Sequence, residues 1–259
     1  MPGIASSINT YYRTDEQIYI VGDALVTADA SIGNDRVVNV VPSQWGSNYG
    51  GYTYLSEIIV PSWKSLTLGS GVTIKRFGDS DYWGSLYVQS GGSLTVGNSV
   101  TIGNAIIGLN LTGNDFTFNG TDSTTVCTIK NCRDWGAIIY ATPLVDLTMK
   151  RVKFENNGTD QYHGGLCLYG TSTHVILDKI TIKDSWYGLY LSGSANGVLK
   201  NSSIENSVQA DRIMLYSFAS LDIDNRSNNI YDNTGQCYYA IKFSVGGPNI
   251  SARGNFWGS

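Results

Sequence analysis

The chain has 259 residues, of which 42% are hydrophobic, enough for one substantial core. Only 15% are charged, whereas glycine (30 residues) and tyrosine (17 residues) are abundant, a balance typical of secreted or cell-surface β proteins. The net charge of −4 argues against a nucleic-acid partner, and no apolar run reaches the roughly 18 residues that a membrane-spanning helix needs.

Residues 1–59 are expected to form an irregular N-terminal cap. The start, Met1-Pro2-Gly3-Ile4, has neither the basic head nor the apolar centre of a signal peptide. The segments 17–23 and 57–60 alternate like strands and flank a Gly/Tyr/Ser-rich excursion at 44–52. Such a region would cover the first coil of a repeating β structure, because an exposed β edge invites aggregation.

From Val60 onward a short motif of β-branched residues recurs every 22 to 28 positions. Its apolar anchors are Ile74, Ile102, Ile129, Phe154, Ile182, Ile204 and Ile230. Two residues after every anchor but the first comes an Asn or Asp: Asn104, Asn131, Asn156, Asp184, Asn206 and Asp232. Asn and Asp tolerate left-handed backbone angles, and stacked copies can bond one another. These six residues therefore predict a structural ladder at one corner of the repeat.

Two further strands recur in each repeat. One has apolar first and third positions, as in Leu166-Cys167-Leu168 and Leu189-Tyr190-Leu191, which indicates a strand with one buried face. The other is seen in Leu94-Thr95-Val96 and Leu147-Thr148-Met149. Three short strands per repeat predict an all-β fold, a right-handed parallel β-helix solenoid of about eight coils over residues 60–259.

Two other β architectures would also suit many short strands. An immunoglobulin-like pair of sandwiches needs hairpins, but Asn-Gly and Asp-Gly turns between alternating runs are nearly absent. A β-propeller blade needs a period of roughly 40 residues or more.

The segment 254–259 falls again at repeat spacing, so the chain stops in mid-repeat. We therefore expect a fragment of a longer protein, or an end covered by end-to-end self-association.

Several segments resemble known right-handed β-helix proteins of bacterial and archaeal surfaces. Residues 60–75 and 84–94 are similar to the opening coils of such proteins, with a v-P-x-G-x-x-L-T-I pattern followed by G-x-L-x-V-x-G-G-x-L. Residues 184–206 resemble the N-x-x-Y-G-I-x-L-x-x-S-x-N unit of carbohydrate-binding and sugar-hydrolase β-helix repeats, and 254–257 resemble their Gly-Asn-Tyr-Trp close. The likeness covers about residues 58–259 and implies the fold. It implies function only weakly, because its members include lyases, glycosidases, adhesins and plain surface proteins.

Acid–base chemistry has few candidates. The outward positions of the clearest strand, Cys167, Tyr190, Met214 and Lys242, include no carboxylate. The catalytic or calcium-binding candidates are Asp79, Asp81 and Asp134, for which the alternative explanation is that they are solvated carboxylates in turns. His163, in a Gln-Tyr-His-Gly-Gly segment, is a further catalytic candidate, and a turn histidine is its plain alternative. No cofactor is expected apart from the calcium alternative.

Aromatic residues offer a binding hypothesis. Trp83, Trp135 and the Trp186-Tyr187 pair each precede a glycine and the same strand of their coils, and Tyr190 lies on that strand. Rings along one edge of the solenoid would stack on the sugars of a polysaccharide or surface glycan; alternatively they cover the end of the core.

The four cysteines, Cys127, Cys132, Cys167 and Cys237, lack metal-ligand spacing and are expected to be mostly free and packed.

These features favour a non-catalytic module, a stalk, adhesin or glycan-contacting surface of a secreted or cell-surface protein. The first alternative is a polysaccharide lyase or glycoside hydrolase, and the second is a self-associating structural solenoid.

Overall fold

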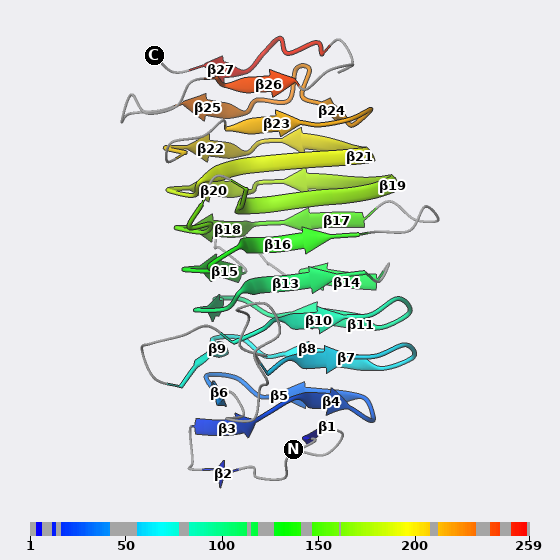
Figure 1. The fold of residues 1–259 in the computed structure, drawn as a ribbon, viewed down its shortest axis with the longest axis vertical. Helices are drawn as coiled ribbons and strands as arrows, with labels where there is room; N and C mark the ends of the chain where they lie inside the picture. The colour runs from blue at the N-terminus through cyan, green and yellow to red at the C-terminus, as the bar shows by residue number, and fades with distance from the viewer. Residues whose placement is uncertain are drawn as a thin grey trace.

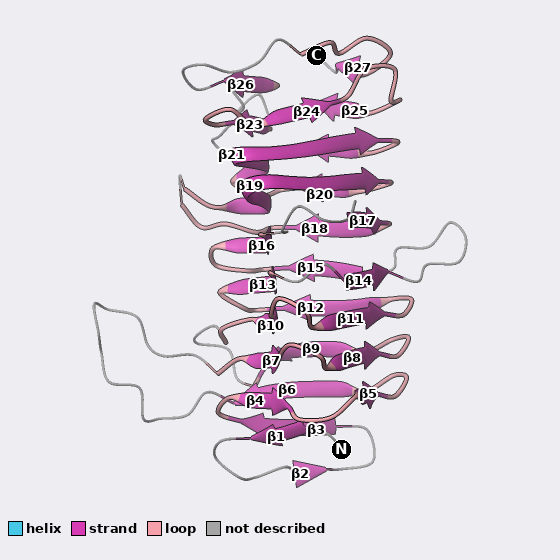
Figure 2. Cartoon of the chain, turned by 90° about the vertical axis from the view of Figure 1, so that its right-hand side faces the viewer, coloured by secondary structure: helices cyan, strands magenta, loops and turns pink. Residues whose placement is uncertain are grey.

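The computed structural model describes residues 4–6, 12–13, 17–41, 56–77, 83–112, 115–118, 127–140, 147–160, 162–207, 212–231, 239–243 and 250–257. Within these residues the regular elements are all strands, which stack into a single column with the N-terminal strands at one end and the C-terminal strands at the other (Figures 1 and 2). No helix in this part of the chain is long and apolar enough to cross a membrane.

The strands form three sheets that run along the column. Sheet 1 has twelve strands. They are β1 (Ile4–Ser6), β4 (Ala24–Val26), β7 (Ile58–Val60), β10 (Leu86–Val88), β13 (Ile107–Leu111), β16 (Trp135–Ile139), β17 (Leu147–Lys150), β19 (Gly164–Asp178), β21 (Tyr187–Lys200), β23 (Ile213–Leu215), β24 (Ser220–Asp222) and β26 (Ile241–Phe243). The long strands β19 and β21 each turn a corner and also pair with β17 and β24.

Sheets 2 and 3 complete the coils. Sheet 2 has eleven strands: β2 (Tyr12–Arg13), β3 (Gln17–Val21), β6 (Val37–Val41), β9 (Thr73–Arg76), β12 (Val100–Gly103), β15 (Cys127–Lys130), β18 (Val152–Glu155), β20 (Thr181–Lys183), β22 (Ser203–Glu205), β25 (Asn229–Tyr231) and β27 (Phe256–Trp257). Sheet 3 has four: β5 (Ala30–Ile32), β8 (Ser65–Leu68), β11 (Ser93–Val96) and β14 (Asp115–Phe118).

Parallel pairing of equivalent residues in successive coils confirms the predicted parallel β-helix. The anchors of the repeat pair in register down sheet 2, from Ile74 on Ile102 and Ile129 to Ile204 on Ile230. All seven anchors are buried at the centre of the column. Period-2 alternation explains this, because every second side chain of a strand points to the same face. Like residues thus stack on like and form one continuous core.

The expected start of the solenoid at Val60 is too late. Strand β3 pairs in parallel with β6, and β6 with β9, so parallel stacking begins at Gln17. The sequence repeat hides these coils because the paired core residues run from 18 to 38 and from 38 to 74, which are 20 and 36 positions apart. Antiparallel strands do lie at the N-terminal edge, where β1 pairs with β4 and β2 with β3.

Candidate functional site

The predicted aromatic edge is only partly aligned. In sheet 1 the register places Trp135 beside Ile107 on one side and Gly164 on the other, with Tyr187 next. Trp83 is wrong as a sugar-binding candidate: it is fully buried, and its indole N–H donates to the Gly103 carbonyl at 2.9 Å. A shift of one residue along a strand moves a side chain to the opposite face, which explains why similar Trp-Gly pairs diverge.

Trp135 forms the floor of a small cluster outside the main core. With Ile138 and Cys167 it is buried on the outer side of sheet 1, and Tyr187 and Tyr190 pack partly exposed against these three residues. The ring centroids of Trp135 and Tyr190 are 5.7 Å apart, and those of Tyr187 and Tyr190 are 6.0 Å apart. Trp135 is only 7% exposed, so the two tyrosines present most of the accessible ring surface. Trp186 is half-buried and precedes this column by one residue.

Tyrosines extend this cluster along the column. We call the tyrosine face the outward side of sheet 1 that carries Tyr87, Tyr140, Tyr169, Tyr187, Tyr190 and Tyr216. Tyr140 and Tyr169, on adjacent coils, make an edge-to-face contact at 5.3 Å. Burial raises the pKa of the Tyr140 phenol, and burial also raises the pKa of Tyr190 although Ser192 hydrogen-bonds to it.

His163 lies at the edge of the Trp135 cluster, between two carboxylates. Its Nδ1 is 2.6 Å from Oδ1 of Asp160, and its Nε2 is 4.0 Å from Oδ2 of Asp134. Asp134 also accepts a 2.9 Å hydrogen bond from Nε of Arg133. The His163 ring meets Trp135 edge-on, with centroids 6.1 Å apart. The structure therefore brings two of the candidates, Asp134 and His163, together, and adds Asp160, which the sequence did not single out.

The family described as "Right handed beta helix region" matches residues 118–255, more than half of the sequence. The chain belongs to the right-handed β-helix family. No curated protein and no solved structure matches it significantly.

The other acidic candidates of this β-helix are Asp79 and Asp81. Asp79 and Asp81 lie outside the described residues, as does Asp232 of the ladder. Among the residues that the structure does describe, no group of three or more His, Cys, Asp or Glu side chains could hold a metal ion. The carboxylates that the structure brings to the edge of the Trp135 cluster are Asp134 and Asp160.

The residues of the corner ladder adopt the left-handed backbone conformation that Asn and Asp tolerate best among residues with a side chain. Asn104, Asn131, Asn156, Asp184 and Asn206 all adopt positive φ between 52° and 56°. Side-chain bonds join neighbours, with Asn156 Nδ2 donating to Asn131 Oδ1 at 2.8 Å and Asn206 Nδ2 to Asp184 Oδ1 at 3.4 Å. These residues turn the β-helix from sheet 2 to sheet 1, and their role is structural.

A second, inner polar ladder escaped prediction. The buried Asn157 accepts from the Cys132 backbone N–H at 3.0 Å, donates to the Ile129 carbonyl at 3.1 Å, and donates its own backbone N–H to Ser185. At another corner Asn228 bridges the Leu199 carbonyl and Asn255. The sequence does carry a signal for the group around Asn157. A small polar or thiol residue directly follows each Asn or Asp of the corner ladder from Asn131 to Asn206: Cys132, Asn157, Ser185 and Ser207.

The described cysteines are structural. Cys127, Cys132 and Cys167 are free and buried, as expected for packed thiols, and Cys237 lies outside the described residues. Burial raises the pKa of all three, to about 12 for Cys132 and for Cys167. A thiol reacts as its thiolate, so none of the three suits a nucleophilic role.

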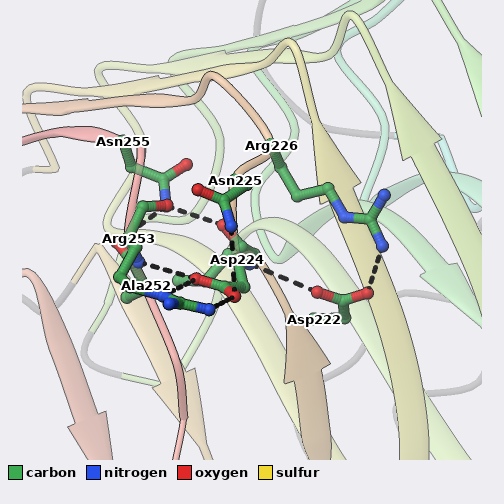
Figure 3. Close-up of polar contacts among 8 residues, drawn as sticks. Asp222, Asp224, Asn225, Arg226, Ala252, Arg253 and Asn255 are labelled. Carbon is green, nitrogen blue, oxygen red and sulfur yellow. Dashed lines mark hydrogen bonds and ion pairs between the residues drawn. The ribbon is translucent and has the colours of Figure 1, made fainter.

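An ion-pair cluster near the C-terminal end is a second polar site. Figure 3 shows Arg253 bound to Asp224 and Arg226 bound to Asp222, on strands and turns of the last coils. Asn255 Nδ2 also donates to the Ile223 carbonyl at 2.6 Å. The Arg253–Asp224 pair joins two successive coils, whereas the Arg226–Asp222 pair lies within one coil, so we read this cluster as structural.

Proposed function

We propose that this β-helix is a glycan-contacting module of a secreted or cell-surface protein, and that the tyrosine face is its binding surface. The observation that carries the proposal is the run of outward tyrosines along sheet 1. Sugars expose apolar C–H faces that stack on aromatic rings, and tyrosine adds a hydroxyl that can bond the sugar's own hydroxyls.

The length of the face suits a chain of sugars rather than a single one. Tyr87 lies on β10 and Tyr216 directly follows β23, which are separated by five coil steps through β13, β16, β19 and β21. At about 4.8 Å a step this distance is roughly 24 Å. A polysaccharide strand lying parallel to the column axis could therefore contact several rings at once.

The chemistry of the face favours a neutral glycan. Its central outward positions are Asn110, Ile138, Cys167, Tyr190 and Met214, none of which is charged at neutral pH. Asp134 and Asp160, at the edge of the Trp135 cluster, place negative charge beside this face and disfavour an acidic sugar. Low surface charge overall supports the secreted or surface-displayed location.

Alanine substitution of Tyr169 and of Tyr190 tests the proposal. Each variant should weaken retention by neutral polysaccharides in affinity gel electrophoresis by about threefold to tenfold, because ring stacking contributes roughly 0.5–1.5 kcal/mol. Tyr169 is 48% exposed, so its variant should keep the wild-type melting temperature.

Trp63→Ala is the matched control, because it removes a ring that is 88% exposed, lies in the turn between β7 and β8, and is not one of the residues that define the tyrosine face. Equal losses of retention in Trp63→Ala and Tyr169→Ala would mean that the tyrosine face has no special role. Failure of the wild-type protein to be retained by any glycan of a broad panel would refute the proposal.

A further inference from the structure

One corner connection of the β-helix is longer than those of the coils on either side of it. Between sheet 2 and sheet 1 these neighbouring coils use residues 131–134 and 184–186, but between β18 and β19 the chain uses 156–163. The extra residues carry Asp160 and His163. Insertions on a regular scaffold are where function concentrates, since the coil itself does not need them.

The longer connection is held firmly onto its neighbours. The N–H of Gly158 donates to the Cys132 carbonyl at 3.0 Å, and that of Thr159 to the Arg133 carbonyl at 2.8 Å. From the other side, the N–H of Tyr187 donates to the His163 carbonyl at 3.1 Å. His163 is thus fixed between the preceding and the following coil, at the border of the tyrosine face.

The two ring nitrogens of His163 have different surroundings. Asp160 accepts a hydrogen bond when Nδ1 carries the proton, which leaves a lone pair on Nε2. The 4.0 Å from Nε2 to Asp134 is too long for a direct hydrogen bond. A water or hydroxyl oxygen can lie about 2.8 Å from both atoms, bonded to Nε2 and to the carboxylate at once. The side chains of His163 and Asp134 are 27% and 20% exposed, so solvent reaches them.

We propose that His163 is a general base that activates water for the hydrolysis of an ester substituent, such as an O-acetyl group, on a neutral glycan bound to the tyrosine face. This inference rests on the proposed function, which supplies the bound glycan. Asp160 is a positioning residue that holds the imidazole in one tautomer, and Asp134 helps to hold the water.

The other reactions of glycans fit the geometry less well. Glycosidases of the common two-carboxylate type hold the scissile bond between an acid and a second carboxylate, about 5–9.5 Å apart. Here the imidazole of His163 occupies the space between Asp134 and Asp160, so the two carboxylates cannot flank a sugar bond in that way. Elimination requires an anionic uronic acid, which Asp134 and Asp160 would repel. Hydrolysis of an uncharged ester needs neither two opposed carboxylates nor an anionic sugar.

The step balances with water as the sole co-reactant. Nε2 of His163 takes one proton from the water, and the water oxygen forms a bond to the ester carbonyl carbon. The tetrahedral intermediate then collapses, and the bond between that carbon and the sugar oxygen breaks. The imidazolium returns its proton to the departing sugar oxygen, which leaves the free glycan hydroxyl and a carboxylic acid.

Acetate release from O-acetylated mannan and O-acetylated xylo-oligosaccharides tests the inference. The wild-type chain should release acetate, and His163→Ala should lower kcat/KM by at least roughly 100-fold, the usual contribution of a general base. Asp160→Asn should lower kcat by about tenfold and leave KM unchanged, as expected for a residue that orients the base. His163→Gln, which keeps a polar side chain of similar length, should be as inactive as His163→Ala.

His174→Ala is the control, because His174 is the other of the two histidines in the chain. Full activity in His174→Ala, with retained glycan binding and an unchanged melting temperature in His163→Gln, supports the proposed base. Retention of the glycan by the wild-type chain without acetate release overturns the inference and leaves the proposed function standing. New reducing ends or unsaturated sugars in place of acetate overturn it as well. Loss of retention itself refutes the proposed function instead.

Discussion

Single polar side chains in the interior decide how the coils are joined. Asn157 is fully buried, yet its amide oxygen and nitrogen are both bonded to backbone groups of the preceding coil. Because no water reaches these groups, an amide at this position satisfies a donor and an acceptor that would otherwise be left unpaired.

Asn157→Ala should therefore lower the free energy of unfolding by about 2–6 kcal/mol, since the change leaves two buried backbone groups without a partner and each costs roughly 1–3 kcal/mol. Urea unfolding followed by fluorescence would measure it. Asn229→Ala, on an exposed strand position, should change the value by less than about 0.5 kcal/mol. Equal effects for both variants would contradict the bridging role.

At the scale of the strand, one glycine makes room for the Trp135 cluster. Gly164 separates Trp135 from Tyr187 in the outward column of sheet 1. A Cβ atom on Gly164 would lie 2.2 Å from the Tyr187 carbonyl oxygen and 2.7 Å from its Cβ, closer than atoms can approach. The absence of a side chain here lets β21 approach β19 and lets Tyr190 reach the indole of Trp135.

Gly164→Ala should destabilise the protein by about 1–3 kcal/mol, the usual cost of overpacking, and should change the near-ultraviolet circular dichroism of the cluster. Thermal unfolding measures the first effect. Gly33→Ala provides a control, because a Cβ at that position would meet nothing within 4 Å. An unaltered spectrum and melting temperature in Gly164→Ala would show that the strands can separate without cost.

For the whole molecule, stability depends on contacts between successive coils, so its ends are expected to open first. At the C-terminal end the Arg253 guanidinium holds the pKa of Asp224 at about 2, below its usual value of 3.8. The Arg226 guanidinium likewise lowers the pKa of Asp222. Both carboxylates favour the folded state when ionised, so their contribution is complete above the ordinary pKa and is lost as the pH falls through the lowered one.

Acidification from about pH 4 towards pH 2 should therefore loosen the last coils before the centre of the column. The protection against hydrogen exchange, relative to the unfolded chain at the same pH, should fall at the amides of Asn225 and Arg253 over this range. The protection at Ile129 and Ile182 should not change. Asp224→Asn should show fast exchange near the C-terminal end already at about pH 7. Uniform acceleration along the whole chain would instead indicate global unfolding.

The repeating part of the fold could be predicted from local sequence patterns. A period of 22 to 28 residues, apolar anchors such as Ile102 and Ile129, and the corner residues from Asn104 to Asn206 together predicted the parallel coils, because stacking places equivalent residues on one another. The early coils at 17–41 were missed since their spacing is irregular, and Trp83 was misplaced because one residue of register separates the core from the surface.

Which non-repeating residues meet could not be predicted, because it depends on how the coils stack. Asp134 lies on one corner connection, Asp160 and His163 lie on the next, and no local sequence pattern relates Asp134 to the other two. The tyrosine face was likewise invisible as a set, because Tyr140, Tyr169 and Tyr216 fall at irregular intervals in the sequence and line up only when the coils stack. Local periodicity fixes how each coil is built, whereas a site on the surface depends on the lengths of the connections that bring distant coils together.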